Sequence, residues 1–202
     1  MKYFHTFWPS DNTDPLQRIY IQWGFSHFFP AGAIATHITD SGHRPIKFTC
    51  DVALTGALGV DRDVAKWTPE ERQTVTATIA LYHDRLRDLV AQGDLYRLES
   101  PYDHPRAALN YVSADQTRAV LFIYQLRESA VGPVKPRGLD PLKHYRVREL
   151  NLPAGAKSQL ALNDQIVDGA ALMSDGLVSP LRRAVESIVI EMAEAPADPS
   201  GK

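Results

Sequence analysis

The sequence predicts an α/β region over residues 1–92, followed by an antiparallel all-β region over residues 93–193. Two observations predict this division. Up to about residue 92, apolar residues recur with helical spacing, and short apolar runs separate the helices. From about Asp94, apolar and polar residues alternate with a period of two, which is typical of half-buried strands.

The first predicted helix begins after Asp14. Asp14 is a good N-cap, and Pro15 suits the first helical position, where a missing backbone N–H costs nothing. Gly24 predicts the end of this helix. One apolar stripe runs along it, formed by Leu16, Ile19, Tyr20 and Trp23.

Two short apolar runs follow, His27–His37 and Ile46–Leu54. Both are predicted to be strand-to-loop transitions, because proline and glycine residues bound them. The alternation of helices with such runs is typical of an α/β fold, although the strands are too few for a closed barrel or a complete doubly wound sheet.

The second predicted helix has a capping box: Thr68 is the N-cap, Pro69 occupies the first position and Glu71 the third. The helix is expected to end at Gly93. Its apolar stripe consists of Val75, Ile79, Tyr82, Leu86 and Leu89.

The second region contains several short alternating segments. Ala107–Val112 and Arg118–Leu126 flank a turn and predict a hairpin, and His144–Leu150 alternates cleanly. Shorter candidate strands are Ser158–Leu162 and Glu186–Met192. Strands at this spacing predict an antiparallel β-sandwich, and residues 194–202 are predicted to be a disordered tail.

Composition excludes several classes of protein. With 22 basic and 24 acidic residues, the net charge of −2 lacks the basic excess of a nucleic-acid-binding protein. No apolar stretch approaches the roughly 18 residues of a membrane span, and no signal peptide is recognisable, so neither nucleic acid nor membrane is an expected partner. The single cysteine, Cys50, cannot form an internal disulfide, which fits a cytoplasmic location.

The segment from Trp8 to Pro15 is the strongest candidate site. It places two carboxylates, Asp11 and Asp14, beside a tryptophan directly before a helix. A carboxyl group at such a strand-to-helix loop can act as a general acid, and Trp8 can stack on a sugar face. The alternative is that both aspartates serve only as turn and cap residues.

Other candidate sites have weaker support. His37, Asp40, His43 and Cys50 match no zinc spacing, so no metal and no cofactor are predicted. The strand tyrosines could line a sugar-binding face, but such residues more often pack in a core. They are Tyr96, Tyr102, Tyr111, Tyr124 and Tyr145. A modest basic cluster is interpreted as a solvated face; it comprises Lys135, Arg137, Lys143, Arg146 and Arg148.

Four blocks in order carry a resemblance to a known family. They are the Ser-Asp-Asn-Thr-Asp block, the Ile-Gln-x-Gly helix, the Val-Ala-x-x-Gly-x-Leu-Gly segment and the Gly-Asp-x-Tyr-Arg-Leu segment. Together they span roughly residues 4–192 and resemble the carboxy-terminal third of microbial, melibiase-like α-galactosidases of glycoside hydrolase family 36.

The resemblance implies a fold and a chemistry. It implies that residues 1–92 are the last strands and helices of a (β/α)8 barrel, with the β-sandwich after them. Members of this family are retaining glycosidases with two catalytic carboxylates, and the acid/base carboxylate maps onto Asp11. Trp8, Ser10 and Asp14 would be its neighbours at the substrate site. The implied ligands are α-galactoside oligosaccharides of the raffinose and melibiose type.

One departure from the family is large. The family's nucleophile lies in an upstream Lys-(Trp or Tyr)-Asp-x-Asn motif, and the closest echo here, Lys66-Trp67-Thr68, has no carboxylate. Retaining hydrolysis needs two carboxyl groups roughly 5–5.5 Å apart, so the chain alone is expected to be inactive. The expectation is therefore a truncated or split α-galactosidase, with a separate chain supplying the rest of the barrel and a possible homo-oligomer. The alternative is a non-catalytic carbohydrate-binding or barrel-completing module.

Overall fold

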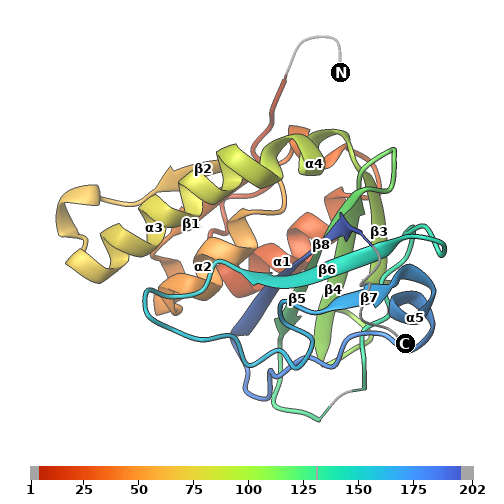
Figure 1. The fold of residues 1–202 in the computed structure, drawn as a ribbon. Helices are drawn as coiled ribbons and strands as arrows, with labels where there is room; N and C mark the ends of the chain where they lie inside the picture. The colour runs from red at the N-terminus through yellow and green to blue at the C-terminus, as the bar shows by residue number, and fades with distance from the viewer. Residues whose placement is uncertain (1–4, 131, 197–202) are drawn as a thin grey trace.

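The computed structural model describes residues 5–130 and 132–196 (Figure 1). Two sheets organise the chain. The small sheet pairs β1 (Ala35–Thr39) in parallel with β2 (Ala57–Asp61). The large sheet is antiparallel, with the order β3-β4-β5-β8-β6-β7. Its strands are β3 (Asp94–Glu99), β4 (Arg106–Val112), β5 (Arg118–Gln125), β6 (His144–Leu150), β7 (Ile166–Asp168) and β8 (Glu186–Ala195).

Helices follow the parallel segments one by one. An isolated parallel bridge joins Phe7 to Ile34, and α1 (Pro15–Phe25) connects the two. After β1 comes α2 (Ile46–Ala53), and after β2 comes α3 (Pro69–Leu81), which continues into α4 (Arg87–Gln92). The result is a short run of parallel strand–helix units.

The structure confirms the predicted starts of both capped helices. Asp14 caps α1 by accepting the backbone N–H of Leu16, and α1 ends at Phe25, one residue beyond Gly24. The capping box of α3 is complete, with the Thr68 hydroxyl bonded to the N–H of Glu71 and the Glu71 carboxylate to the N–H of Thr68. A π-helical turn over 82–86 joins α3 to α4, so the predicted stripe lies on one continuous helix.

The prediction for Ile46–Leu54 was wrong, because this run forms the helix α2. A short apolar run does not distinguish a buried strand from a buried helix by periodicity. Here Lys47 pairs with Asp51 at i,i+4, and Phe48 and Val52 share the buried face. The strand of the next unit is β2, which follows Gly56 and which the sequence analysis did not identify.

The predicted hairpin is confirmed by the pairing of β4 with β5, and His144–Leu150 is confirmed as β6. The predicted sandwich is corrected to one six-stranded sheet in the described residues. Ser158–Leu162 is not a strand but a loop and turn. Leu160 of this segment packs in the core cluster that also contains Val147 of the sheet. The strand β8 continues to Ala195, past the predicted start of the tail, and residues 197–202 of that tail lie outside the described residues.

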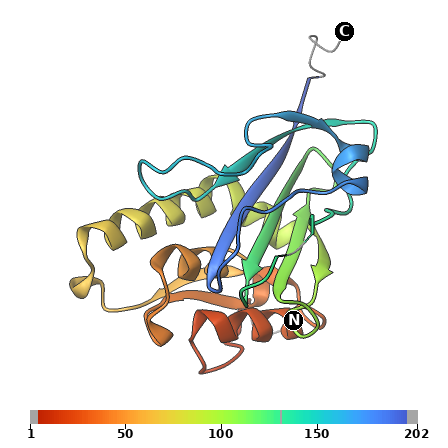
Figure 2. The same cartoon turned by 90° about the horizontal axis from the view of Figure 1, so that it is seen from below.

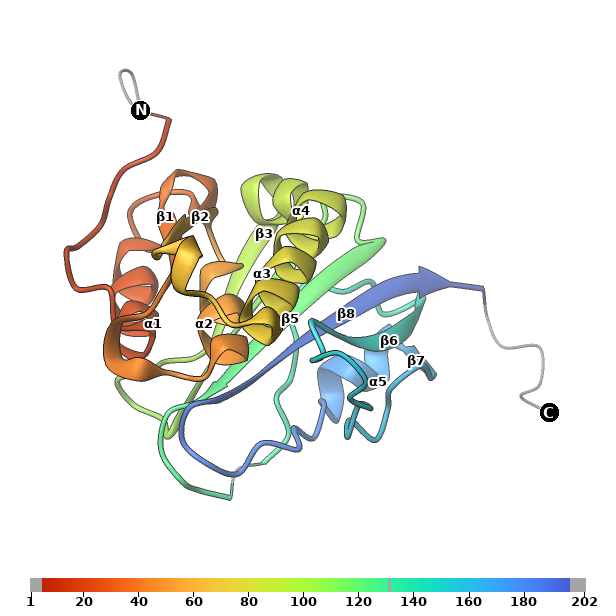
Figure 3. The same ribbon diagram turned by 90° about the vertical axis from the view of Figure 1, so that its left-hand side faces the viewer.

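The large sheet has a core on each face. One core lies between the sheet and α1–α4, where Phe48 and Leu86 pack in the same cluster as Phe122 and Val189. The other core lies under α5 (Gly169–Ser174) and the long loops of the second half. Figures 2 and 3 show the helices of the first half on one side of the sheet and α5 on the other. Because the first core contains side chains from both halves, the sheet is the platform that carries the strand–helix units.

Candidate functional site

The loop from Trp8 to Asp14 lies at the carboxyl ends of the parallel segments. It leaves the Phe7 bridge and enters α1, next to the loop that follows β1. Hydrogen bonds of Thr13 help to join these loops: the Thr39 hydroxyl donates to the carbonyl of Thr13 at 2.7 Å, and the hydroxyls of Thr13 and Ser41 lie 2.5 Å apart. Reactive side chains of α/β enzymes gather at this end of parallel strands.

Asp11 presents an exposed carboxylate from this loop. Trp8 Nε1 donates to Asp11 Oδ1 at 3.1 Å, which ties the two predicted site residues together. The hydroxyl of Ser10 accepts the backbone N–H of Asn12 at 3.1 Å and shapes the turn around Asp11. A carboxyl group held by one donor and open to solvent can exchange a proton with a bound ligand.

Trp8 is packed against two further side chains. Its ring centroid lies 4.5 Å from that of His37, with an interplanar angle of 33°. The guanidinium carbon of Arg18 lies 5.2 Å from the Trp8 ring centroid, within cation–π range. The indole nevertheless remains 40% exposed, so part of its surface is free for a ligand.

His37 lies on the small sheet beside Gly59, its register partner on β2. A Cβ at position 59 would stand 2.1 Å from Cδ2 of His37, so only glycine accommodates the imidazole there. Desolvation, together with the nearby charge of Arg18, lowers the pKa of His37 and favours its neutral form. The imidazole therefore supports Trp8 as an uncharged ring.

Asp14 occupies a different environment from Asp11. Arg44 donates Nε and Nη2 to its two carboxylate oxygens at 2.9 and 2.7 Å, and the N–H of Leu16 bonds to Oδ1. The hydrogen bond from Arg44 is the largest effect lowering the pKa of Asp14. The carboxylate is thus engaged by a helix cap and an ion pair, which is the alternative that the sequence left open for this residue.

The sequence analysis missed Arg18, Arg44 and Gly59 as members of this site. Arg18 had a visible signal: it lies with Ile19 and Trp23 on the buried face of α1, where a charge is unexpected. No local pattern identified Arg44. Gly59 closes the Val-Ala-x-x-Gly-x-Leu-Gly segment, but its contact with His37 comes from the neighbouring strand.

The structure assigns Cys50 and three of the five candidate tyrosines to packing, whereas Tyr102 is 64% exposed. Among the described residues, no group of His, Cys, Asp and Glu is placed to hold a metal ion, and Cys50 is fully buried. Burial raises the pKa of that thiol to about 12. Tyr111, Tyr124 and Tyr145 are core residues that donate to backbone carbonyls. No described helix has both the length and the apolarity to cross a membrane.

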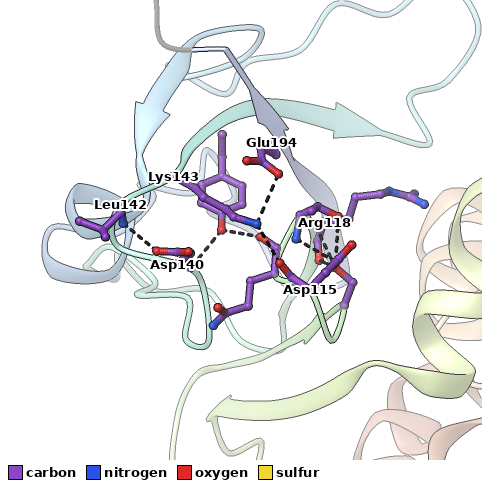
Figure 4. A network of polar contacts seen from close by, with 10 residues as sticks. Asp115, Arg118, Asp140, Leu142, Lys143 and Glu194 are labelled. Atoms are coloured by element: carbon purple, nitrogen blue, oxygen red, sulfur yellow. Dashed lines mark hydrogen bonds and ion pairs between the residues drawn. The ribbon is translucent and has the colours of Figure 1, made fainter.

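The basic cluster is polar surface: Arg146 and Arg148 are exposed on β6, and Lys135 and Arg137 are exposed on the loop before it. Lys143 donates to the carbonyl of Asp115 at 2.8 Å and pairs with Glu194 at 3.4 Å (Figure 4). Hydrogen bonds from Ser113 and Thr117 lower the pKa of Asp115 to about 2. This network fixes the turn between β4 and β5.

Comparison with known families and proteins places these features in context. The Melibiase family model matches residues 1–93, and the model of the glycosyl hydrolase family 36 C-terminal domain matches residues 106–192. A probable α-galactosidase C of Aspergillus terreus is 34% identical over 200 residues, covering 94% of this chain. The α-galactosidase AgaA of Geobacillus stearothermophilus is 32% identical over 157 residues, or 73% of this chain.

Solved structures give the same result. The crystal structure of the family 36 α-galactosidase AgaB from Geobacillus stearothermophilus has a TM-score of 0.79 and 29% identity over 93% of this chain. Variants of AgaA in complex with raffinose and with stachyose each have a TM-score of 0.78. This chain spans about a quarter of the length of these relatives, between 21% and 25%. The chain belongs to glycoside hydrolase family 36 and comprises a segment of its α-galactosidases that includes their C-terminal domain.

Proposed function

We propose that this chain supplies the acid/base half of a retaining α-galactosidase site, with Asp11 as the acid/base. The observation that supports this most directly is the exposed Asp11 carboxylate at the carboxyl end of the parallel strands, held by Trp8 within the segment that matches the family. Asp11 would protonate the glycosidic oxygen as the galactosyl group leaves, and then activate water.

The substrate class follows from the relatives. AgaA variants have been crystallised with raffinose and stachyose, so α-galactoside oligosaccharides are the proposed ligands here. Trp8 and Ser10 would line the galactose side of the site. Asp14 would act indirectly by fixing the helix start that carries the loop.

A second carboxylate is required for the covalent step. The sequence holds no Lys-(Trp or Tyr)-Asp-x-Asn motif, so the nucleophile would come from polypeptide outside these 202 residues. We propose that this polypeptide, on a separate chain, completes the barrel. The 202-residue chain by itself should give no sustained turnover of melibiose or raffinose.

The test is an assembled enzyme. The chain is mixed or co-expressed with the upstream part of a family 36 α-galactosidase, and hydrolysis is measured with raffinose and with 4-nitrophenyl α-galactoside. Asp11→Asn should lower kcat/KM for raffinose by about 10²–10⁴-fold, because general acid catalysis contributes that much. The loss should be far smaller for the nitrophenyl substrate, whose leaving group needs little protonation. Full activity of Asp11→Asn on raffinose would exclude Asp11 as the acid.

A matched control is Asp40→Asn. Asp40 is also an exposed carboxylate directly after a parallel strand, but it makes no contact with Trp8 in the described structure. Asp40→Asn should leave kcat/KM unchanged for raffinose and for 4-nitrophenyl α-galactoside.

A specific surface favours the second candidate, a module that completes a barrel without chemistry of its own. A hollow of about 350 Å³ runs along the solvent side of α1, and its wall includes Phe28, which is 83% exposed. Tyr20, Phe25 and Tyr102 also line it. Exposed apolar patches of this kind mark interaction sites.

Calorimetry distinguishes the alternatives. Saturable binding of raffinose by the isolated chain would favour a sugar-binding module, and binding of the upstream polypeptide without turnover would favour a structural one.

A further inference from the structure

Arg18 is a buried charge beside the candidate acid. The residue is 3% exposed, and within residues 5–130 and 132–196 no carboxylate lies within ion-pair distance of it. Burying an unpaired charge is costly unless its donors are satisfied. The contacts of its guanidinium show where this cost is offset.

The guanidinium bridges two elements. Nη1 donates to the carbonyl of Ser10 at 3.0 Å, and Nη2 donates to the carbonyl of Ala35, the first residue of β1, at 2.6 Å. Its central carbon also faces the ring of Trp8. Trp8 and Ser10 are two of the three residues that precede Asp11, so Arg18 fixes the approach of the loop to this carboxylate.

We propose that Arg18 is the positioning residue for Asp11 and acts through Trp8 and the Ser10 carbonyl. This inference rests on the proposed function, since Asp11 is the group whose position matters. The planar fork of arginine serves two carbonyls and one ring at once, which the point charge of lysine does not reproduce. His37 contacts the same indole, so the Trp8 ring is held by a charged and by an uncharged partner.

Positioning matters because proton transfer depends on geometry. A displacement of about 1 Å from the productive arrangement can cost about 10²-fold in rate. Without Arg18, the Trp8 ring would lose its cation partner and the Ser10 carbonyl its donor. The Trp8–Asp11 hydrogen bond would then no longer be fixed relative to β1.

The test uses the 202-residue chain labelled with ¹⁵N. The chain has three tryptophans, so three indole N–H peaks are expected in the NMR spectrum. Asp11→Asn shifts the Trp8 peak and thereby assigns it, because Asp11 accepts its hydrogen bond. The peaks of Trp23 and Trp67 report on the folded state of the rest of the first half.

Arg18→Gln should move the Trp8 peak and reduce its response to Asp11→Asn at least threefold, with the Trp23 and Trp67 peaks unchanged. Arg18→Lys, which keeps the charge, should lose most of this response as well. Arg97→Gln is the matched control, because Arg97 donates to the Ser26 hydroxyl and carbonyl, away from Trp8. It should leave the response intact.

Two outcomes would overturn the proposal. One is an undiminished response of the Trp8 peak in Arg18→Gln. The other is collapse of all three peaks in both Arg18 variants, which would assign Arg18 to the fold as a whole. Because this readout needs no turnover, it decides the role of Arg18 separately from the raffinose assay, which decides the role of Asp11.

Discussion

Asp14 illustrates how one carboxylate serves two neighbouring elements. It caps α1 through the N–H of Leu16 and holds Arg44 of the loop after β1. We expect Asp14→Ala to lower the free energy of unfolding by about 1–2 kcal/mol at neutral pH, since loss of an N-cap costs about that much. Urea unfolding followed by circular dichroism measures this. Arg44→Ala keeps the cap and should cost less; an equal or larger loss would contradict this division.

The same ion pair predicts a pH dependence. The hydrogen bond from Arg44 lowers the pKa of Asp14 in the folded protein below its ordinary value of 3.8. The ionised Asp14 therefore contributes its full stabilisation above the pKa of the unfolded chain, and this contribution is lost as the pH falls through the pKa of the folded protein. The difference in unfolding free energy between wild type and Asp14→Ala should stay constant down to about pH 5 and shrink below about pH 4. Urea titrations across this range test it, and a constant difference at the acid end would contradict it.

Gly59 is required by a contact across the small sheet. A methyl group there would meet Cδ2 and Nε2 of His37 at 2.1 and 2.3 Å, so the imidazole that packs on Trp8 must shift. Gly59→Ala should cost about 1–3 kcal/mol, as overpacking usually does, and alter the near-ultraviolet circular dichroism of the tryptophans. Gly132→Ala is the control, because a methyl group there has no neighbour within 4 Å. Equal effects of the two variants would refute the contact.

At the scale of the element, the start of α3 is set by its own sequence. The reciprocal bonds between Thr68 and Glu71 satisfy two N–H groups of the first turn. Thr68→Ala should therefore lower the unfolding free energy by about 1 kcal/mol, and Thr68→Ser should be nearly neutral. Thermal unfolding of the two variants compares them directly, and a similar loss in both would mean that the methyl group rather than the hydroxyl matters.

At the scale of the molecule, Asp51 ties the strand–helix units to the large sheet. This carboxylate is fully buried and accepts from Lys47 at 2.5 Å, Asn151 at 2.6 Å and Ser187 at 2.7 Å. Removing one partner of a buried ion pair costs about 3–5 kcal/mol. Asp51→Ala should show a loss of this size.

The shared core implies that both halves unfold together. Tryptophan fluorescence reports on the first half, which contains all three tryptophans, and far-ultraviolet circular dichroism reports on both. In Asp51→Ala, the urea midpoints measured by fluorescence and by circular dichroism should fall by the same amount. Asp88→Ala is the control, because Asp88 belongs to an exposed ion pair, and it should leave both midpoints unchanged. Separate transitions in the wild type would contradict a cooperative unit.

The sequence by itself determined those features whose physical cause is local. Caps at Asp14 and Thr68 fix helix starts within four residues. Alternation identified β6 because side-chain period and strand geometry coincide, and the turn between two apolar runs identified the hairpin of β4 and β5. The pairing of Trp8 with Asp11 also lay within one short loop. The helix α2 was not predicted, because an eight-residue apolar run is too short for helical spacing to be distinguished from a buried strand.

Only the tertiary structure decided what depends on contacts between distant segments. The sequence named Asp11 and Asp14 together, but the position of Arg44 shows that one carboxylate is engaged and the other is open. Likewise, the fully buried Asp51 gains two of its three partners, Asn151 and Ser187, from the loop after β6 and from β8, more than 90 residues away. Local sequence sets the backbone conformation of each element, whereas the free energy of a buried charge depends on whichever groups the fold brings beside it.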